Sequence, residues 1–306
     1  MALKELIVYV DQTEGALSRA RLAADLARRH ESRLVALFIR EFSQAQLDLL
    51  NDADLGLASG EDLDRVKRRI GSSIDEAADR LRSLFEALGR EHRLEIEWRR
   101  VEGSASVVVP EHARYADLCI LGPNELGDDA SIPYAFSEKL LFATGHPLLF
   151  IPSLGSFETL GRHIIVGWNA SRPATRAVSD ALPLIERAER TTVITIDSVL
   201  VDRGGISAAD RLVQYLRRHS ASIEAVKLED VSARSIADVL QATARTLGGD
   251  LIVAGAYSHP KLWEDLFGGI TRDLLHRMNF PIFMSHCRPT RSPALHGRSS
   301  LRCTFS

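Results

Sequence analysis

Cysteine is scarce in this chain, and the cysteines present are not arranged to bridge or to bind metal. The 306 residues include three cysteines, and no two of them form a C-x-x-C pair. A disulfide framework or a zinc site needs more thiols at closer spacing, so we expect neither. Cys119 lies inside an apolar run typical of a buried strand, where we expect an inert core residue.

Long apolar runs and an excess of positive charge are also missing. Apolar runs such as 147–151 are far shorter than the ~20 residues that cross a bilayer. The net charge of −3 offers no general attraction for nucleic acid or for an anionic membrane surface. The first residues, MALKELIVYV, enter a predicted strand at once, so we expect no signal peptide. These features predict a cytoplasmic protein with no nucleic-acid partner and no membrane partner.

Known catalytic signatures are missing as well. The chain contains no G-x-G-x-x-G after a strand, no G-x-x-x-x-G-K-[ST], no H-E-x-x-H and no G-x-S-x-G. Its ten histidines are scattered, and no two stand at the spacing of metal ligands on one helix. No positioned base, nucleophile or metal cluster is visible, which favours a non-enzymatic function. We predict no catalytic residue and no metal ligand.

The most informative feature that the sequence does contain is an internal repeat. The hydrophobic content of 45% and the charged content of 26% are ordinary for a globular protein, and 306 residues suffice for two domains. Four landmarks recur in the same order, which is hard to obtain by chance. They pair 6–11 with 163–169, 18–20 with 175–177, 116–122 with 249–255, and 145–150 with 279–284. We therefore predict two copies of one α/β unit, at 1–152 and 153–287, with a linker over 152–162.

Strand-like and helix-like patterns alternate within each copy. From Leu63 to Leu88 the apolar positions recur in steps of three and four, which predicts a long helix that projects beyond the sheet and is capped by Gly89. Short apolar runs such as 251–254 are typical of strands buried on both faces. The alternation predicts an α/β fold with a doubly wound parallel sheet in each copy.

The ends of these strands indicate where a ligand would bind. Parallel sheets bind ligands outside the carboxyl ends of their strands, where the strand order switches. In the first copy this edge carries Asp11 and Gly122, and in the second it carries Asn169 and Gly255. We therefore predict one candidate binding edge in each copy.

The stretch 250–286 gives the binding edge of the second copy a specific pattern. It reads as strand, glycine loop, helix and strand, and the N-terminus of a helix is a natural anion site. It resembles the C-terminal half of a universal stress protein domain. That family carries a nucleotide motif of Gly, two residues, Gly, nine residues, Gly, then Ser or Thr. The same frame here holds Gly255, Ser258, Gly268 and Gly269.

The resemblance covers both copies, roughly residues 3–286, and implies a universal stress protein that acts in stress response. It implies an adenine nucleotide such as ATP as the ligand, with the end of the first strand near the base or ribose and the glycine loop near the phosphates. It also implies an internal pseudo-dimer, paired through the last strands at 148–151 and 282–285, and a homodimer. The implied binding residues are Asn169, Ile196, Gly255, Ser258, Gly268, Gly269 and Thr271 in the second copy, and Asp11, Ile39, Gly122 and Ser137 in the first.

Both copies depart from the family motif. Ser258 adds a Cβ where the motif has its second glycine, and Gly269 removes a hydroxyl that Thr271 could supply instead. In the first copy Glu125 replaces the second glycine, and a carboxylate beside polyphosphate repels it by about 1 to 4 kcal/mol. The residues 134–135 also replace the later glycine pair. If a nucleotide binds, we therefore expect it in the second copy.

Three functions stay open at this stage. The first is a non-enzymatic stress-response protein that binds ATP, ADP or AMP, the second is a slow nucleotide hydrolase on the same fold, and the third is a ligand-free scaffold acting through dimer contacts. His259 stands in the predicted ligand loop, while packing is the preferred role for Trp168 and Trp263. Residues 288–306 carry four arginines and no acid, which predicts a disordered basic tail, with a docking tail as the alternative.

Overall fold

The computed structural model describes residues 2–13, 15–41, 60–122, 135–153, 155, 157–196, 205–220, 222–229, 235–256 and 269–286. The predicted basic tail at 288–306 lies outside these residues.

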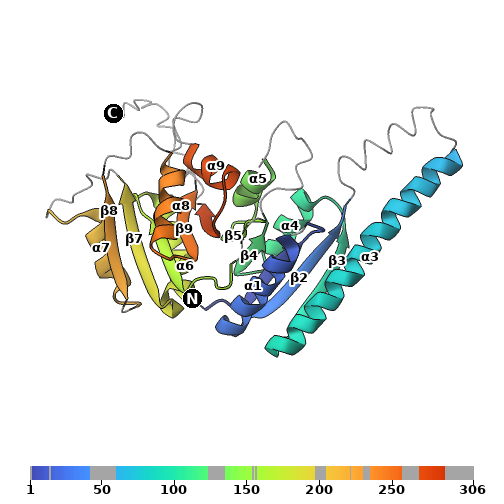
Figure 1. The fold of residues 1–306 in the computed structure, drawn as a ribbon, viewed down its shortest axis with the longest axis horizontal. Coiled ribbons are helices and arrows are strands. Elements are labelled where there is room, and N and C mark those ends of the chain that lie inside the picture. Colours follow the sequence, from blue (N-terminus) through green and yellow to red (C-terminus); the bar gives the residue numbers. More distant parts are fainter. Residues whose placement is uncertain are drawn as a thin grey trace, which may run out of the picture.

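Strands and helices alternate within each half of the described chain, as the sequence predicts, and β5 of the first half is followed by β6 of the second (Figure 1). The first half contains β1 (Glu5–Val10), α1 (Gly15–His30), β2 (Arg33–Arg40), α3 (Gly60–His92), β3 (Ile96–Glu102), α4 (Ala105–Ala113), β4 (Leu118–Leu121), α5 (Ala135–Ala143) and β5 (Leu148–Phe150). The second half contains β6 (His163–Gly167), α6 (Arg172–Arg187), β7 (Arg190–Ile196), α7 (Ala208–Leu216), β8 (Ile223–Leu228), α8 (Ile236–Thr246), β9 (Leu251–Ala256), α9 (Gly269–His276) and β10 (Ile282–His286).

The ten strands form one sheet in the order β3-β2-β1-β4-β5-β10-β9-β6-β7-β8. Each half therefore has the same internal order, and its strands pair in parallel. The halves meet at β5 and β10, which pair antiparallel with Ile282 opposite Phe150. The predicted α/β class and the predicted pairing of the last strands are confirmed. One continuous sheet joins the two halves, and the exact domain boundaries stay a prediction.

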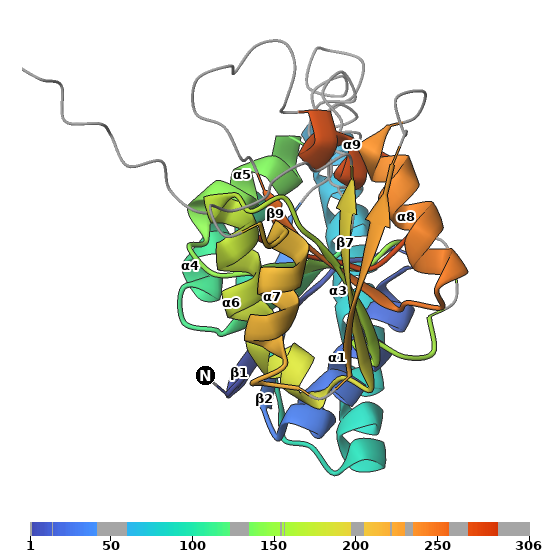
Figure 2. The same ribbon diagram turned by 90° about the vertical axis from the view of Figure 1, so that its left-hand side faces the viewer.

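Helices cover both faces of the sheet, as Figure 2 shows for the second half, where α7 and α8 lie on opposite sides of β7. Alternate residues of each strand face opposite layers, so Val8 joins the core under α1, α3, α6 and α7 while Ile7 joins the core under α4, α5, α8 and α9. Cys119 is fully buried in the second of these cores. Burial raises the pKa of its thiol to about 12, which agrees with the predicted inert role.

The long helix α3 differs from the sequence prediction at its end. It extends beyond the sheet, as predicted (Figure 1), but it continues to His92, so the prediction that Gly89 caps it is wrong. The chain turns at Arg93, which adopts a left-handed conformation with φ of 54°. Gly89 serves packing instead, because a Cβ there would lie 3.0 Å from the carbonyl oxygen of Leu94.

Two matching aspartates fix the entry into the first strand of each half. The Asp117 carboxylate accepts hydrogen bonds from the backbone N–H groups of Lys4 and Glu5, at 2.6 and 2.9 Å. The Asp250 carboxylate accepts hydrogen bonds at 2.7 to 3.0 Å from four groups in the matching segment, on Thr159, Gly161, Arg162 and His163. Because the two aspartates occupy equivalent positions before β4 and β9, the repeat extends to individual side chains.

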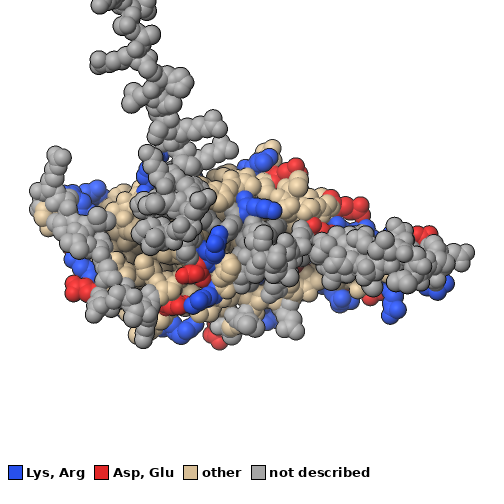
Figure 3. Space-filling view, turned by 90° about the horizontal axis from the view of Figure 1, so that it is seen from above, with Lys and Arg blue, Asp and Glu red and all other residues tan. Residues whose placement is uncertain are grey.

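Charged side chains of both signs are interspersed over the described surface seen from above (Figure 3). Some of them attach α3 to the sheet, as where Arg40 of β2 pairs with Asp75 at 3.1 Å, and Arg40 also pairs with Glu102 of the neighbouring strand β3 at 3.2 Å. Exposed pairs of this kind contribute ~0–1 kcal/mol each, so the apolar stripe of α3 dominates its attachment. None of the helices in the described part of the chain is both long and apolar enough to cross a bilayer.

Candidate functional site

A pocket of about 260 Å³ opens at the carboxyl ends of β6 and β9 in the second half. Its walls are largely apolar and come from six elements that surround this edge of the sheet, β6, α6, β7, α8, β9 and α9. The residues that line it are Gly167, Trp168, Asn169, Ala174, Ile194, Ile196, Ile236, Leu240, Ala254, Gly255, Ile270, Thr271 and Leu274. Four of the predicted binding residues, Asn169, Ile196, Gly255 and Thr271, are therefore brought together.

Asn169 lies at the exposed mouth of this pocket, between β6 and α6. Its side-chain oxygen accepts a hydrogen bond from the N–H of Ser171 at 3.2 Å, and Ala170 between them has a positive φ of 55°. Ser171 then caps α6 by accepting a hydrogen bond from the N–H of Ala174 at 3.3 Å. This tight turn holds the Asn169 amide at the rim. On the opposite wall, Thr271 lies in the first turn of α9 and is buried.

Gly255 is required by packing as well as by its position in the predicted motif. A Cβ at this residue would lie 2.3 Å from the backbone nitrogen of Ala174 and 2.4 Å from the carbonyl carbon of Pro173. The N-terminus of α6 therefore presses directly on the end of β9. Since both contacts are with backbone, no side-chain movement would make room for a larger residue.

The remaining predicted residues of the second half are placed only in part. Gly269 begins α9, while Ser258, Gly268, His259 and Trp263 lie outside the described residues. Trp168 is half-buried and packs against the core under α6 and α7, which agrees with its predicted packing role.

The equivalent edge of the first half is filled by a buried arginine. Arg19 is 1% exposed, and its Nη2 lies 2.5 Å from Oδ2 of Asp11. Its Nε donates a hydrogen bond to the Tyr9 carbonyl at 3.1 Å. A Cβ at Gly122 would lie 2.2 Å from its Nη1. The two residues predicted as the binding edge, Asp11 and Gly122, are thus near one another, but the guanidinium of Arg19 occupies the space between them.

The buried stripes of α1 and α6 show what replaces Arg19 in the second half. Seven buried positions of each helix correspond at a constant offset, 15, 16, 19, 20, 23, 26 and 27 in α1 and 173, 174, 177, 178, 181, 184 and 185 in α6. This register makes Asp11 equivalent to Asn169 and Arg19 equivalent to Ala177. The predicted alignment of 18–20 with 175–177 is therefore wrong by one residue. It matched the identical Arg-Ala pairs, but Arg19 is buried on α1 whereas Arg176 is not among the buried residues of α6.

Sequence reasoning missed Arg19, although the sequence held a signal for it. The residue interrupts a stripe of small apolar residues that includes Ala16, Ala20 and Ala23, all buried. A charged residue on the buried face of a helix needs a partner, and Asp11, directly after β1, is that partner. The other predicted residues of this half, Ile39 and Ser137, are buried on β2 and α5. Glu125 and Tyr134 lie outside the described residues.

A second buried ionisable group of the first half lies at the end of α1. Burial, together with the positive charges of Arg187 and Arg29, lowers the pKa of His30 from 6.5 to about 4. Arg187 on α6 donates to the carbonyl of Arg29, so this group lies where the two halves touch. His30 is consequently neutral at neutral pH. In the helix register given above, its equivalent in the second half is Ala188.

The fold and the pocket together define a class of protein, a doubly wound parallel α/β protein with a ligand-sized pocket at the carboxyl edge of its sheet. Within the residues that the structure describes, no group of three or more His, Cys, Asp or Glu side chains could hold a metal ion.

Comparison with solved structures identifies the fold. A universal stress protein from Archaeoglobus fulgidus DSM 4304 is 14% identical, aligns over 92% of this chain and 98% of its own, and has a TM-score of 0.64. The functionally unknown protein PA1789 from Pseudomonas aeruginosa PAO1 is 17% identical over 93% of both chains, with a TM-score of 0.49. A universal stress protein in complex with cAMP is 17% identical over 50% of this chain and 100% of its own, with a TM-score of 0.33.

The first of these similarities shows that the chain has the universal stress protein fold, as predicted, and the two lower TM-scores add no argument. No family model and no curated protein matches the sequence.

Proposed function

We propose that this chain is a stress-response protein of the universal stress protein type, which binds an adenine nucleotide in the second half without catalysing a reaction. The observation that carries the proposal is the convergence of Asn169, Ile196, Gly255 and Thr271 on one pocket. These residues come from the β6–α6 loop and three separate elements, and the motif resemblance selects them without knowledge of the pocket.

The chemistry of the pocket suits an adenine nucleotide. The apolar walls formed by Ile194, Ile196 and Leu240 can hold a flat base, and the Asn169 amide at the rim can hydrogen-bond ribose hydroxyls. The start of α9, with Gly269 and Thr271, would face the phosphates, since the N–H groups of a first helical turn favour anions. A bound nucleotide would act as a regulatory signal, and this chain would bind it without changing it chemically.

The first half is proposed not to bind nucleotide. The positive charge of Arg19 is already neutralised by Asp11, and the guanidinium fills the place that a ribose would take. Burying a nucleotide there would first require this buried ion pair to open, which costs several kcal/mol, on the order of 3–5.

The two halves are further proposed to act as an internal pseudo-dimer, and the whole chain to form a homodimer. The antiparallel pairing of β5 with β10 supports the first proposal, because each half covers the edge strand of the other. Sedimentation of the purified chain tests the second. A single species with the mass of one chain at micromolar concentration would contradict the homodimer.

Calorimetric titration with ATP, ADP and AMP tests the proposed function. We expect saturable binding of one nucleotide per chain, weakened at least tenfold, about 1.4 kcal/mol, by Ile236→Glu, because this residue lines the pocket and is 37% exposed. Ser104→Glu is the control, since it places a carboxylate directly before α4, the counterpart of α8 in the first half. Equal effects of the two variants would contradict the site. Absence of binding by all three nucleotides would favour the scaffold, and steady phosphate release would favour the hydrolase.

A further inference from the structure

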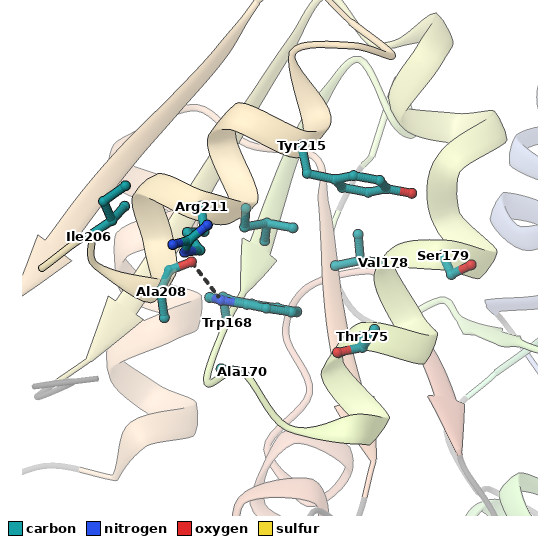
Figure 4. A pocket seen from close by; sticks show the side chains of 10 residues that line it. Trp168, Ala170, Thr175, Val178, Ser179, Ile206, Ala208, Arg211 and Tyr215 are labelled. Carbon is teal, nitrogen blue, oxygen red and sulfur yellow. Dashed lines mark hydrogen bonds between the residues drawn. The ribbon is translucent and has the colours of Figure 1, made fainter. Parts of the chain in front are cut away.

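The second half contains another pocket, of about 640 Å³, between α6 and α7 (Figure 4). Among its described lining residues it shares only Trp168 with the pocket at the β6–β9 edge. We propose that this α6–α7 pocket binds a small planar aromatic anion, such as an aromatic carboxylate. The proposal is independent of the nucleotide site, because the two pockets share no other described lining residue.

The α6–α7 pocket arises from a difference in helix packing between the halves. In the first half α3 has 33 residues and packs along α1. In the second half its counterpart α7 has nine residues, and its contact with α6 is at most marginal. The space between these helices is left lined by side chains of the apolar core, including Val178 and Leu212. A volume of 640 Å³ lies within the ~300–1,000 Å³ of pockets that take small organic ligands.

Two aromatic rings give the pocket flat walls. The Trp168 indole is held in place because its N–H donates a hydrogen bond to the Ala208 carbonyl at 3.2 Å. Figure 4 shows the ring of Tyr215, on α7, directed into the same space from the other side. A rigid ring is a preorganised wall, so little side-chain entropy is lost when a flat ligand stacks against it.

The charge of the lining selects an anion over a cation. Among the described residues that line the pocket, Arg211 carries the only charge and no carboxylate is present. Thr175 and Ser179 add hydroxyl groups from α6, but the Thr175 hydroxyl already donates to the Ser171 carbonyl at 3.0 Å, so the charge preference rests on Arg211. A guanidinium at the rim of an aromatic slot matches a flat apolar body with one carboxylate.

Titration calorimetry with 2-naphthoate as the probe tests the proposal on the full chain. Ser179→Trp should abolish binding, because Ser179 is exposed on α6 and a large side chain there would fill the pocket without disturbing the core. Gln214→Trp is the matched control, since Gln214 is exposed on α7 but does not line the pocket. Arg211→Gln should weaken 2-naphthoate about tenfold and leave the neutral analogue 2-naphthamide within about twofold.

Three results would overturn the proposal. The first is no heat of binding for 2-naphthoate up to millimolar concentration, and the second is equal loss in the two Trp variants. The third is displacement of 2-naphthoate by ATP in direct competition, which would assign the probe to the β6–β9 pocket instead. Unchanged nucleotide titrations in Ser179→Trp would show that the two sites are separate.

Discussion

The two halves of this molecule share a strand order and a helix register, yet they differ at the point where a ligand would bind. In the second half, Asn169 and Ala177 leave a pocket at the carboxyl edge of the sheet. In the first half, the equivalent residues are Asp11 and Arg19, and their ion pair fills that edge. The fold around the two edges is therefore shared, and the ion pair occupies the place that the pocket takes in the second half.

The filled edge of the first half rests on a buried ion pair. A carboxylate at the end of the first strand needs a partner once it is buried, and Arg19 supplies from within the chain the charge and the hydrogen bonds. A similar difference recurs at the end of the same helices, where His30 of the first half corresponds to Ala188 of the second. The first half thus has buried Arg19 and His30 at positions where the second half has Ala177 and Ala188.

The largest expected effect comes from converting the first half toward the second. Arg19→Ala leaves the buried Asp11 carboxylate without its partner and should lower the free energy of unfolding by about 3–5 kcal/mol, as measured by urea denaturation. The double change Asp11→Asn with Arg19→Ala recreates the pair found in the second half and should recover about 2 kcal/mol of that loss. Additive effects of the two changes would show that the ion pair is not the reason for the difference.

Glycines at the matching strand ends should respond differently to the same substitution. Gly255→Ala forces a Cβ onto the backbone of α6 and should destabilise the protein by about 3 kcal/mol. Gly122→Ala meets the end of the Arg19 side chain, which can shift, so we expect about 1 kcal/mol. Thermal and urea denaturation of both variants measure the contrast. A larger loss from the Gly122 change would mean that Arg19 is as immovable as backbone.

The buried histidine gives the first half a dependence on pH. The pKa of His30 lies near 4 in the folded chain, below its ordinary value of 6.5, so its contribution is complete above pH 6.5 and is lost as the pH falls toward 4. Between pH 7 and pH 5 we expect the free energy of unfolding to fall by about 2 kcal/mol, and we expect no such fall in His30→Asn. Urea denaturation of both proteins at the two pH values checks this. Parallel losses in both would assign the effect to other groups.

Much of the fold followed from the sequence because repetition and periodicity are local properties. The strand at 251–254 and the long stripe from Leu63 to Leu88 are visible without tertiary contacts, and the structure places a strand and a helix there. Gly89 failed as a helix cap because its small size serves contact with the next segment, and Arg93 makes the turn. Glycine alone does not distinguish these two uses.

The candidate site was predictable to the extent that it rests on strand ends. Asn169, Ile196 and Gly255 follow or end strands, so a parallel sheet brings them together. Arg19 and the α6–α7 pocket were missed, because both depend on where a helix lies across the sheet. The shared Arg-Ala letters at 19–20 and 176–177 even suggested the wrong register.

The central claim is that one nucleotide site exists and that it lies in the second half. Photolabelling of the full chain with 8-azido-ATP, followed by tryptic mapping, tests it directly. We expect label on the peptides 163–176 or 191–203, which carry Asn169 and Ile196, and none on the peptide 5–19, which carries Asp11 and Arg19. Excess ATP should prevent this labelling. Competable label on 5–19 would contradict the account, because it would show that Arg19 does not close the first site.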